Sequence, residues 1–451
     1  MEKIVIIGGV AAGTKAAAKS RRLRPDANID IYTEDTHVSY SACGLPFFIE
    51  GNFNDFNMLI ARTPEQFEEK NIHIHLLNRC TKILSDKKQV IILNLETNEE
   101  FSVDYDKLVI ATGARPFVPP IKNVKLENVF TLRTLEDGIN IKEKVLQSKH
   151  ATIVGGGYIG IELLEAFVKQ GLKVTLIEFA PTIMPVFDDD ISELIKEHIL
   201  ERDGKNVEII NSDAVTELIG EKEVTGVKTR NGNEIKTDFV VIATGVKPNV
   251  ELAVDAGIEL GETGAIKVNK KMQTNIKDIY AAGDCIEKIN LVSNTPMWIP
   301  LGSTANKEGR CAAINLCGEE DEFEGILGSA VTRYFGFTMS ITGLTEKQAK
   351  KLGYEPISTI ITKEDKVGYM PEAKNITIKL IADKNTRNLL GAQGIGCGDA
   401  DKRVNTVATS LLCPMRIDDF FSSDLTYSPP YSPSIDPLLT AAENLIKKLK
   451  T

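Results

Sequence analysis

The sequence predicts an α/β fold in which two Rossmann-like dinucleotide-binding domains are followed by a C-terminal α+β domain. The observations behind this prediction are two glycine-rich turns, each set between a strand and a helix, and a change to alternating strands after about residue 323. A chain of 451 residues is long enough for about three domains.

The first dinucleotide-binding unit begins at the N-terminus. Lys3 to Ile7 has the apolar pattern of a buried strand, residues 8–13 form a glycine-rich turn, and an alanine-rich segment typical of a helix continues to about Arg24. A second strand pattern, from Ile29 to Tyr32, completes a βαβ unit. We expect the turn to hold a pyrophosphate at the N-terminus of the helix.

The glycine fingerprint of this first turn is imperfect. Val10 occupies the position of the second glycine, so Gly8 and Gly13 carry the match. An acidic residue is usual at the end of the second strand, where Thr33 comes first and Glu34 follows one place later. The sequence leaves open which of these two residues meets the ribose.

The second dinucleotide-binding unit has the full fingerprint. A strand at 152–154 leads into a turn with glycines at all three positions, Gly155, Gly157 and Gly160, and a helix and a strand at 173–177 follow. Glu178 ends that strand, where its carboxylate would accept the ribose hydroxyls of NADH and repel the extra phosphate of NADPH. The sequence therefore predicts NADH as the preferred nucleotide, with NADPH a poorer one.

Two similar segments mark where the chain passes between the domains. A strand from Leu108 ends in Ala111, Thr112 and Gly113, and the same strand-Thr-Gly pattern returns at 240–245, so residues 112–245 read as an insertion. The strand at 279–281 leads the chain back to the first domain and places Asp284 at its end, suited to a ribityl hydroxyl of a flavin.

The region after residue 323 carries no nucleotide motif. Strands are expected at 331–342, 358–362, 376–382 and 389–396, followed by helix and a proline-rich tail. A sheet with helices and no site of its own is typical of an oligomer interface.

Cys43 is the candidate reactive residue. It stands alone in Ser-Ala-Cys-Gly-Leu-Pro, and the next cysteine is Cys80, too distant in sequence to be a local partner. A redox-active Cys43 would therefore cycle between a thiolate and a mixed disulfide or a sulfenic acid. Gly44 and Pro46 suit the start of a helix, whose N-terminus would lower the pKa of the thiol.

Composition narrows the choice of function and compartment. The net charge of −10 argues against a nucleic-acid partner, and no stretch is long and apolar enough to span a membrane. The chain runs into its first strand without a signal-peptide pattern, and its seven cysteines show neither pairing nor metal-ligand spacing. We expect a cytoplasmic protein without a metal, its six other cysteines being structural.

Taken together, these residues resemble the FAD-dependent pyridine nucleotide-disulfide oxidoreductases, whose fold is glutathione reductase-like. The lone cysteine in Ser-Ala-Cys-Gly-Leu-Pro is similar to that of the branch containing coenzyme A disulfide reductase, NADH oxidase, NADH peroxidase and the persulfide reductases. The resemblance implies FAD on residues 1–111 and 246–322, NADH on 112–245, and a homodimer made by 323–451. It further implies that electrons pass from NADH to flavin to Cys43, with Tyr158 gating the nicotinamide pocket and Glu162 near the flavin.

One position within the first turn helps to choose among these branches. Oxidase and peroxidase members usually carry a histidine where this chain has Ala11, and the resulting turn is similar to that of coenzyme A disulfide reductase. His37 is the histidine that could approach the cysteine through the fold.

Coenzyme A carries phosphates that need cations. Lys15, Lys19 and Arg22 recur at helical spacing and can hold phosphates from one helix face. By resemblance this face contacts coenzyme A with Ser39 beside it, and Tyr369 and Tyr427 approach the cysteine from the partner subunit.

The sequence thus predicts an NADH-dependent flavoenzyme that reduces coenzyme A disulfide, or a coenzyme A persulfide or polysulfide, through Cys43. One alternative is an NADH oxidase or peroxidase that works through a cysteine sulfenic acid. Another is a flavoprotein that responds to NADH and binds partners without thiol turnover.

Overall fold

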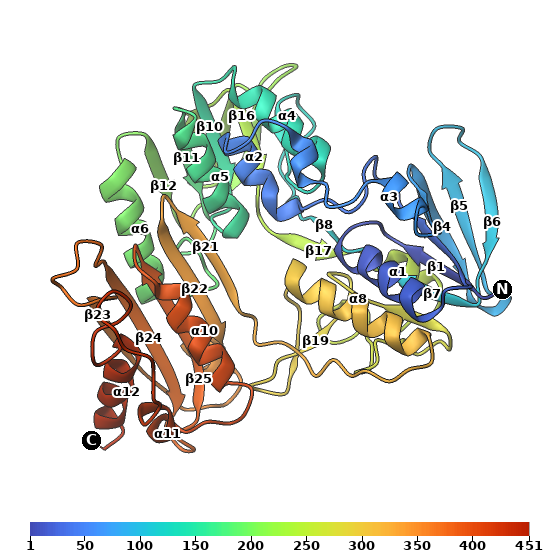
Figure 1. Ribbon diagram of the computed structural model, residues 1–451. Helices are drawn as coiled ribbons and strands as arrows, with labels where there is room; N and C mark the ends of the chain where they lie inside the picture. Colours follow the sequence, from blue (N-terminus) through green and yellow to red (C-terminus); the bar gives the residue numbers. More distant parts are fainter. Residues whose placement is uncertain (451) are drawn as a thin grey trace.

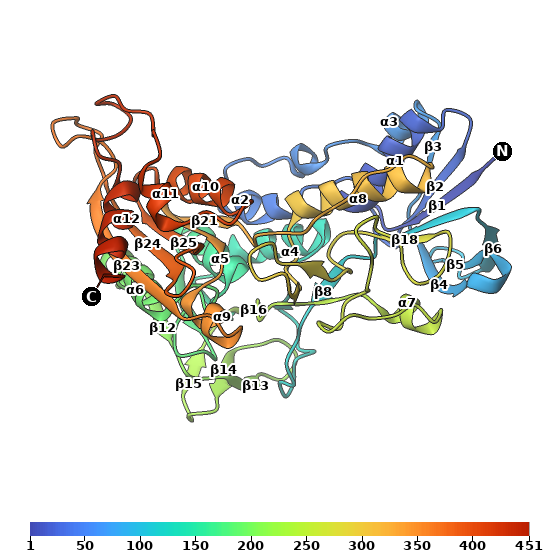
Figure 2. The same cartoon turned by 90° about the horizontal axis from the view of Figure 1, so that it is seen from below.

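The computed structural model describes residues 1–450, which are arranged around three five-stranded sheets. Figures 1 and 2 show the N-terminal segment at one side, the green middle segment beside it, and the red C-terminal segment at the opposite end. Among residues 1–450, no helix combines the length and the apolar character that crossing a bilayer requires.

The first sheet is built from segments far apart in sequence. Its strands run parallel in the order β18-β7-β1-β2-β3. Their bounds are β1 (Lys3–Ile7), β2 (Asn28–Tyr32), β3 (Ile72–His75), β7 (Lys107–Ile110) and β18 (Ile279–Ala281). The register pairs Ile7 with Tyr32 and Ile110, Tyr32 with His75, and Ile110 with Ala281, so all five strands end at one edge. Turns that follow these strands therefore meet there.

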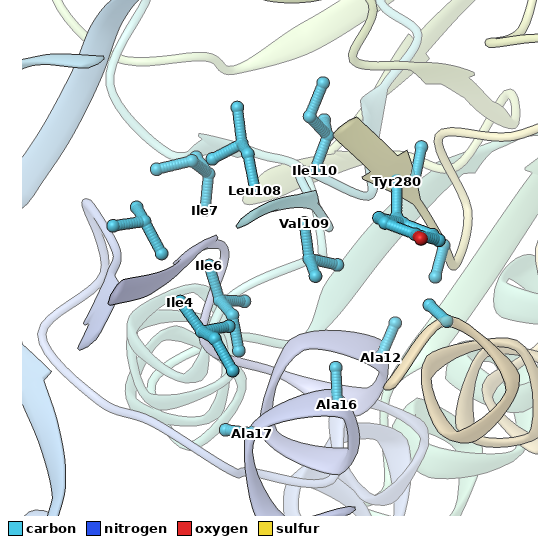
Figure 3. Packing of buried hydrophobic residues seen from close by; sticks show 14 of the residues in the cluster. Ile4, Ile6, Ile7, Ala12, Ala16, Ala17, Leu108, Val109, Ile110 and Tyr280 are labelled. Atoms are coloured by element: carbon cyan, nitrogen blue, oxygen red, sulfur yellow. The ribbon is translucent and has the colours of Figure 1, made fainter. Parts of the chain in front are cut away.

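Small side chains bring the helices close to this sheet. Figure 3 shows Ala12, Ala16 and Ala17 of α1 (Ala11–Leu23) facing Ile4 and Ile6 of β1 and Val109 of β7. On its other side α1 packs along α8 (Gly302–Leu316), where Gly309 leaves room for the backbone of Ala12. This close packing fixes the turn at the start of α1 against the sheet edge.

Shorter elements surround the first sheet. An antiparallel meander lies next to it, formed by β4 (Asn78–Leu84), β5 (Gln89–Asn94) and β6 (Glu100–Asp104). The remaining short elements are η1 (Ala42–Gly44), α2 (Leu45–Glu50), η2 (Phe56–Leu59), α3 (Pro64–Glu68), η3 (Ser85–Lys87), α7 (Glu251–Asp255), β19 (Lys288–Ile289) and β20 (Pro296–Met297).

The second sheet repeats the parallel arrangement, in the order β12-β11-β10-β16-β9. Its strands are β9 (Val129–Phe130), β10 (His150–Val154), β11 (Lys173–Ile177), β12 (Val207–Ile210) and β16 (Phe239–Ile242). Helices α4 (Leu135–Val145), α5 (Tyr158–Lys169) and α6 (Asp189–Asp203) accompany it, with a small antiparallel sheet of β13 (Val215–Ile219), β14 (Gly226–Thr229) and β15 (Glu234–Lys236).

Two short strands join the sheets. β8 (Ala114–Pro116) leads away from the first sheet, and β17 (Val246–Pro248) returns antiparallel to it. Phe117 also donates its N–H to Gly245 O at 2.9 Å. The chain therefore leaves and re-enters through one hydrogen-bonded ribbon.

The C-terminal sheet is antiparallel, in the order β21-β22-β25-β24-β23. Its strands are β21 (Ala330–Tyr334), β22 (Phe337–Gly343), β23 (Pro356–Glu364), β24 (Asn375–Asp383) and β25 (Leu389–Gly396). Helices α9 (Glu346–Lys351), α10 (Ala400–Ser410), α11 (Ile417–Phe421) and α12 (Pro437–Lys448) accompany them. The expectation of one strand over 331–342 is wrong, because Phe335 and Gly336 adopt positive φ and turn that segment into a hairpin.

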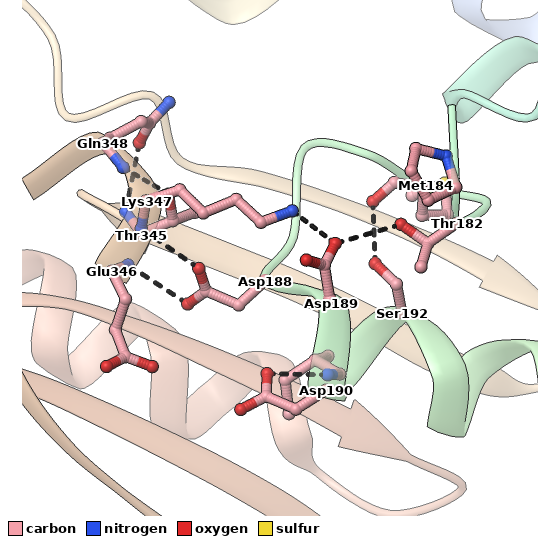
Figure 4. A network of polar contacts seen from close by, with 12 residues as sticks. Thr182, Met184, Asp188, Asp189, Asp190, Ser192, Thr345, Glu346, Lys347 and Gln348 are labelled. Carbon is pink, nitrogen blue, oxygen red and sulfur yellow. Dashed lines mark hydrogen bonds and ion pairs between the residues drawn. The ribbon is translucent and has the colours of Figure 1, made fainter. Parts of the chain in front are cut away.

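A polar network joins the second sheet's segment to the C-terminal one. Asp188, at the start of α6, accepts hydrogen bonds from the backbone N–H groups of Glu346 and Lys347 at the start of α9, as Figure 4 shows. The side chain of Gln393 on β25 donates to the same carboxylate at 2.6 Å. The two segments are thus held together by buried polar contacts as well as by apolar packing.

Candidate active site

Cys43 lies between the first and second sheets. It sits in η1, directly before α2, and α2 packs against α4 and α5. Leu45 and Ile49 are buried in the same apolar cluster as Leu163 of α5. Burial of these apolar side chains fixes the cysteine turn beside the helix that follows the second glycine turn, while Cys43 itself remains exposed.

The surroundings of Cys43 raise the pKa of its thiol. The largest cause is loss of hydration around the sulfur, because protein atoms crowd it although part of the residue stays accessible. The carboxylates of Glu162 and Asp284 raise the pKa further, while Arg133 acts in the opposite direction. The prediction of a thiol pKa lowered by a helix N-terminus is therefore wrong, because α2 has only six residues and its dipole does not offset burial and two negative charges.

The first glycine turn has the close approach that a dinucleotide-binding turn requires. Gly8 has a φ of +113°, and a Cβ there would collide with the carbonyl oxygen of Ala111. A Cβ at Gly13 would collide with the carbonyl oxygen of Gly8. Thr112 and Gly113 continue from Ala111 along this edge, where Thr112 donates its hydroxyl to Asn249 O at 2.8 Å.

The strand end beside this turn carries both candidates for a ribose contact. Thr33 is buried, whereas Glu34 is exposed and pairs with Arg79 of β4 at 2.6 Å. Asp35, one residue further, has its pKa raised to about 6, mainly by burial and then by the charge of Glu34. Thr33 is therefore enclosed by the protein, whereas Glu34 lies at the surface and is already held by an ion pair.

Asp284 presents an unpaired carboxylate oxygen at the same edge. Its Oδ2 lies 3.4 Å from Arg133, and its backbone oxygen accepts a hydrogen bond from the indole of Trp298 at 2.8 Å. Its Oδ1 is buried and has no hydrogen-bond partner among the described residues. A buried acceptor of this kind needs a donor, and a ribityl hydroxyl of FAD supplies one, so the residues present fit the flavin.

The second glycine turn repeats the first. Gly155 and Gly160 lie where a Cβ would collide with backbone atoms, whereas Gly157 opens onto free space. Glu178 is 8 % exposed, and its two carboxylate oxygens accept N–H groups from Gly156 at 2.6 Å and from Ala180 at 2.7 Å. The strand-end acid is therefore fixed directly against the turn, an arrangement that fits the adenosine ribose of a dinucleotide.

Helix α5 follows this turn; it begins at Tyr158, and Glu162 lies one helical turn further along. Burial raises the pKa of the Tyr158 phenol above its ordinary value. Burial also raises the pKa of Glu162 to about 7, against the opposing effect of the Thr332 hydroxyl, which donates to Glu162 Oε1 at 2.9 Å. Thr332 belongs to β21, so the C-terminal sheet takes part in setting the charge near Cys43.

A basic hollow of about 220 Å³ lies along α1. Lys15, Arg22 and Ser39 line it, together with Arg62. A neighbouring hollow of about 370 Å³ shares Arg22 and Arg62 and adds further cations, Arg21 and Lys70. Lys19 lines neither hollow, so two of the three predicted helix cations are brought together with Ser39 and the third is not.

The two predicted tyrosines lie elsewhere. Tyr369 is in the β23–β24 connection and Tyr427 is in the segment between α11 and α12, and both are exposed. Both views of the molecule place these connections at its far end from α1. Within one chain, neither tyrosine is therefore brought to the hollow.

His37, the candidate substitute for the histidine that Ala11 replaces, is engaged by other groups. Its Nδ1 lies 3.0 Å from Glu136 Oε1, and its ring meets Phe56 edge-on. Among residues 1–450, no group of three or more metal-type side chains is arranged to hold a metal ion.

Three residues of this site were missed in the sequence. Arg62 comes from a loop, Arg133 from the segment before α4, and Thr332 from a strand of another sheet. Each reaches the site through tertiary contacts, so no local pattern marks it. The proline at position 64 and the Thr63 cap could have placed Arg62 just before a helix, but not facing α1.

Comparison with known proteins agrees with this geometry. A model of the pyridine nucleotide-disulphide oxidoreductases matches residues 2–298, and a model of their dimerisation domain matches residues 329–438. The chain is 37 % identical over 448 residues to the NAD(P)H coenzyme A polysulfide/persulfide reductase of Pyrococcus horikoshii, covering 98 % of each. It is 34 % identical over 452 residues to an NADH oxidase of Methanocaldococcus jannaschii, covering 99 % of each.

A solved structure is similar over almost the whole chain. The NAD-dependent persulfide reductase of A. fulgidus superposes with a TM-score of 0.96 at 36 % identity, covering 99 % of this chain and 84 % of that one.

Proposed function

Because this chain belongs to the pyridine nucleotide-disulphide oxidoreductases, we propose that it uses NADH to reduce coenzyme A disulfide, or a coenzyme A persulfide or polysulfide, at Cys43. It is an FAD-dependent oxidoreductase of this family. The choice of substrate rests on the basic hollow along α1, which lies on the same domain as Cys43.

The FAD would be held at the edge of the first sheet, within residues 1–111 and 246–322. Gly8 and Gly13 would give the pyrophosphate close access to the backbone, and the free Oδ1 of Asp284 would accept a hydrogen bond from the ribityl chain. Thr33 or Glu34 would meet the adenosine ribose. When bound, FAD takes two electrons from the nicotinamide and supplies them to sulfur.

The NADH would be held by residues 112–245. Gly155, Gly157 and Gly160 form its pyrophosphate turn, and Glu178 would receive its ribose hydroxyls. Tyr158, at the start of α5, would cover the nicotinamide pocket, and Glu162 would lie toward the flavin.

Cys43 provides the reacting sulfur. Its thiolate attacks one sulfur of coenzyme A disulfide, a bond forms between Cys43 and that sulfur, and the other coenzyme A leaves as a thiolate. Two electrons then cleave the mixed disulfide, which releases the second coenzyme A and restores the Cys43 thiolate. The balance is one NADH and one proton consumed for two coenzyme A thiols released.

The basic hollow supports coenzyme A over smaller disulfides. Lys15, Arg22 and Arg62 are cations that can bind a pyrophosphate and a 3′-phosphate by charge-assisted hydrogen bonds, with Ser39 beside them. Glutathione disulfide and pantethine have no phosphate for these residues to bind.

Replacing Cys43 with Ser tests the proposal. The variant should keep FAD and its reduction by NADH, because the glycine turns and Asp284 are unchanged, and it should lose turnover of coenzyme A disulfide and persulfide. Cys80→Ser, at a buried thiol on β4, is the matched control and should keep turnover. Undiminished disulfide reduction by the Cys43 variant would refute the mechanism.

Oxygen or peroxide reduction is the second candidate function. An exposed Cys43 without a local cysteine partner can be oxidised to a sulfenic acid and reduced again. Turnover of oxygen or peroxide far faster than of any disulfide would favour this candidate despite Ala11.

We further infer a homodimer formed by residues 323–451. The family's dimerisation domain matches there, and exposed apolar side chains gather in this region, among them Val331, Ile360, Tyr369, Tyr427 and Ile435. In such a dimer Tyr369 and Tyr427 would reach the partner's Cys43, where a phenol can protonate a leaving thiolate. Seven unpaired thiols suit a reducing compartment such as the cytoplasm.

A further inference from the structure

A fully buried ion pair lies directly behind the Asp284 turn. Lys288 Nζ is 3.5 Å from Glu308 Oε1, and the two side chains are 1 % and 0 % exposed. Glu308 projects from α8, and Lys288 belongs to β19. Two charges withdrawn from water are costly unless each makes further contacts, so a pair at this depth requires an explanation.

Both members of the pair hold the same glycine. Glu308 Oε2 accepts the N–H of Gly283 at 2.8 Å, and Lys288 Nζ donates to the carbonyl oxygen of Gly283 at 3.3 Å. Gly283 has a φ of +91°, in the left-handed region that few other residues adopt. The ion pair therefore clamps the peptide groups on both sides of Gly283, in a turn that glycine adopts readily.

The clamp extends to Asp284 itself. Trp298 donates its indole N–H to the backbone oxygen of Asp284, so three side chains bind three backbone groups of the Gly283–Asp284 turn. The side-chain Oδ1 of Asp284 is left without a partner. Fixing the backbone in this way presents that oxygen to a ligand at little cost in conformational entropy.

We propose that Glu308 and Lys288 are positioning residues for FAD, which act by clamping the Gly283–Asp284 turn so that Asp284 is preorganised for the ribityl chain. This inference rests on the proposed function, in which Asp284 contacts FAD. The pair itself lies behind the turn and contributes through Asp284.

The test compares FAD release from holoenzyme variants. Glu308→Gln keeps the volume and one acceptor for Gly283 but leaves Lys288 without its counter-charge, so FAD should dissociate about 10-fold faster or more, the loss expected for one buried charged hydrogen bond. Release is followed by the rise of flavin fluorescence after dilution. Trp298, the sole tryptophan of the chain, reports the state of the turn in the same sample.

A double-mutant cycle separates positioning from a general structural role. In an Asp284→Ala background, Glu308→Gln should increase the rate of FAD release by less than about threefold. The effects of two substitutions that act through one contact are not additive. Fully additive effects, with thermal stability falling in parallel, would overturn the inference. Glu308→Gln combined with Lys288→Met, which leaves no unpaired buried charge, should recover part of the loss.

Lys107→Met is the matched control. Lys107 pairs with Asp278 at 2.6 Å at the opposite end of the same sheet, so its loss should leave FAD release unchanged. If Asp284→Ala does not speed FAD release, the assignment of this turn to FAD fails. If Asp284→Ala speeds release and Glu308→Gln does not, only the clamp fails.

Discussion

Glu178 occupies its position before any nucleotide binds, because both of its carboxylate oxygens already accept backbone N–H groups. A 2′-phosphate would bring a like charge against this fixed and nearly buried carboxylate, at a cost of a few kcal/mol, about 10-fold to 1000-fold in affinity. We therefore expect kcat/KM to be far higher with NADH than with NADPH.

Glu178→Gln should lower the ratio of kcat/KM for NADH to kcat/KM for NADPH by about 10-fold or more, mainly by raising kcat/KM for NADPH. Glu208→Gln, which changes an exposed acid on the neighbouring strand, should leave the ratio unchanged. Equal kcat/KM values for the two nucleotides in the unaltered enzyme would show that Glu178 does not meet the ribose.

The charge of Glu162 should affect the pKa of the Cys43 thiol. The carboxylate raises the pKa of the thiol, so Glu162→Gln, which removes that negative charge, should lower the thiol pKa and increase the thiolate fraction at pH 7. The rate of Cys43 alkylation as a function of pH measures this shift. Glu143→Gln, at an exposed acid of α4, is the control. A profile moved to higher pH by Glu162→Gln would contradict the argument.

At the scale of elements, helix α1 offers an internal control for the role of the basic hollow. Lys15→Ala with Arg22→Ala and Arg62→Ala should lower kcat/KM for coenzyme A disulfide by about 10-fold to 100-fold, chiefly through KM, since each exposed contact contributes about 0.5–1 kcal/mol. The loss should shrink as salt rises. Lys19→Ala removes a cation of the same helix that lines neither hollow, and it should have little effect.

The elements that the sequence predicted well are those governed by local pattern. Both glycine turns and their flanking strands lie where apolar runs and glycine spacing put them, because backbone collisions at Gly8 and Gly155 leave no alternative residue. The β21–β22 hairpin was missed because its turn residue, Gly336, stands inside a run of strand-forming residues and follows Phe335, which has no turn preference. Arg62 and Thr332 could not be predicted, since only the packing of distant segments brings them to the site.

At the scale of the whole molecule, one buried lysine joins two parts of the chain. Lys379 on β24 is 1 % exposed, and its Nζ lies 3.1 Å from Asp188, 2.7 Å from Asp190 and 2.6 Å from Glu346. Lys379→Met would leave these carboxylates without their cation, so the free energy of unfolding should fall by about 3–5 kcal/mol.

Lys347→Met is the matched control for this prediction. Its partner Asp189 is exposed, as the lysine is, and Figure 4 shows the pair beside the same network. Its loss should cost less than about 1 kcal/mol in denaturant unfolding. Similar decreases in the free energy of unfolding for the two variants would mean that Lys379 does not hold the C-terminal sheet to the α6 segment.

The ribbon of β8 and β17 also sets an order of assembly during synthesis. All five strands of the second sheet lie between residues 129 and 242, so that sheet is complete before β17 leaves the ribosome. The first sheet, although its opening strand is made at once, lacks its edge strand β18 until residue 281 has been translated. The second sheet can therefore fold while the first sheet is still incomplete. The first sheet must wait until β18 has been synthesised.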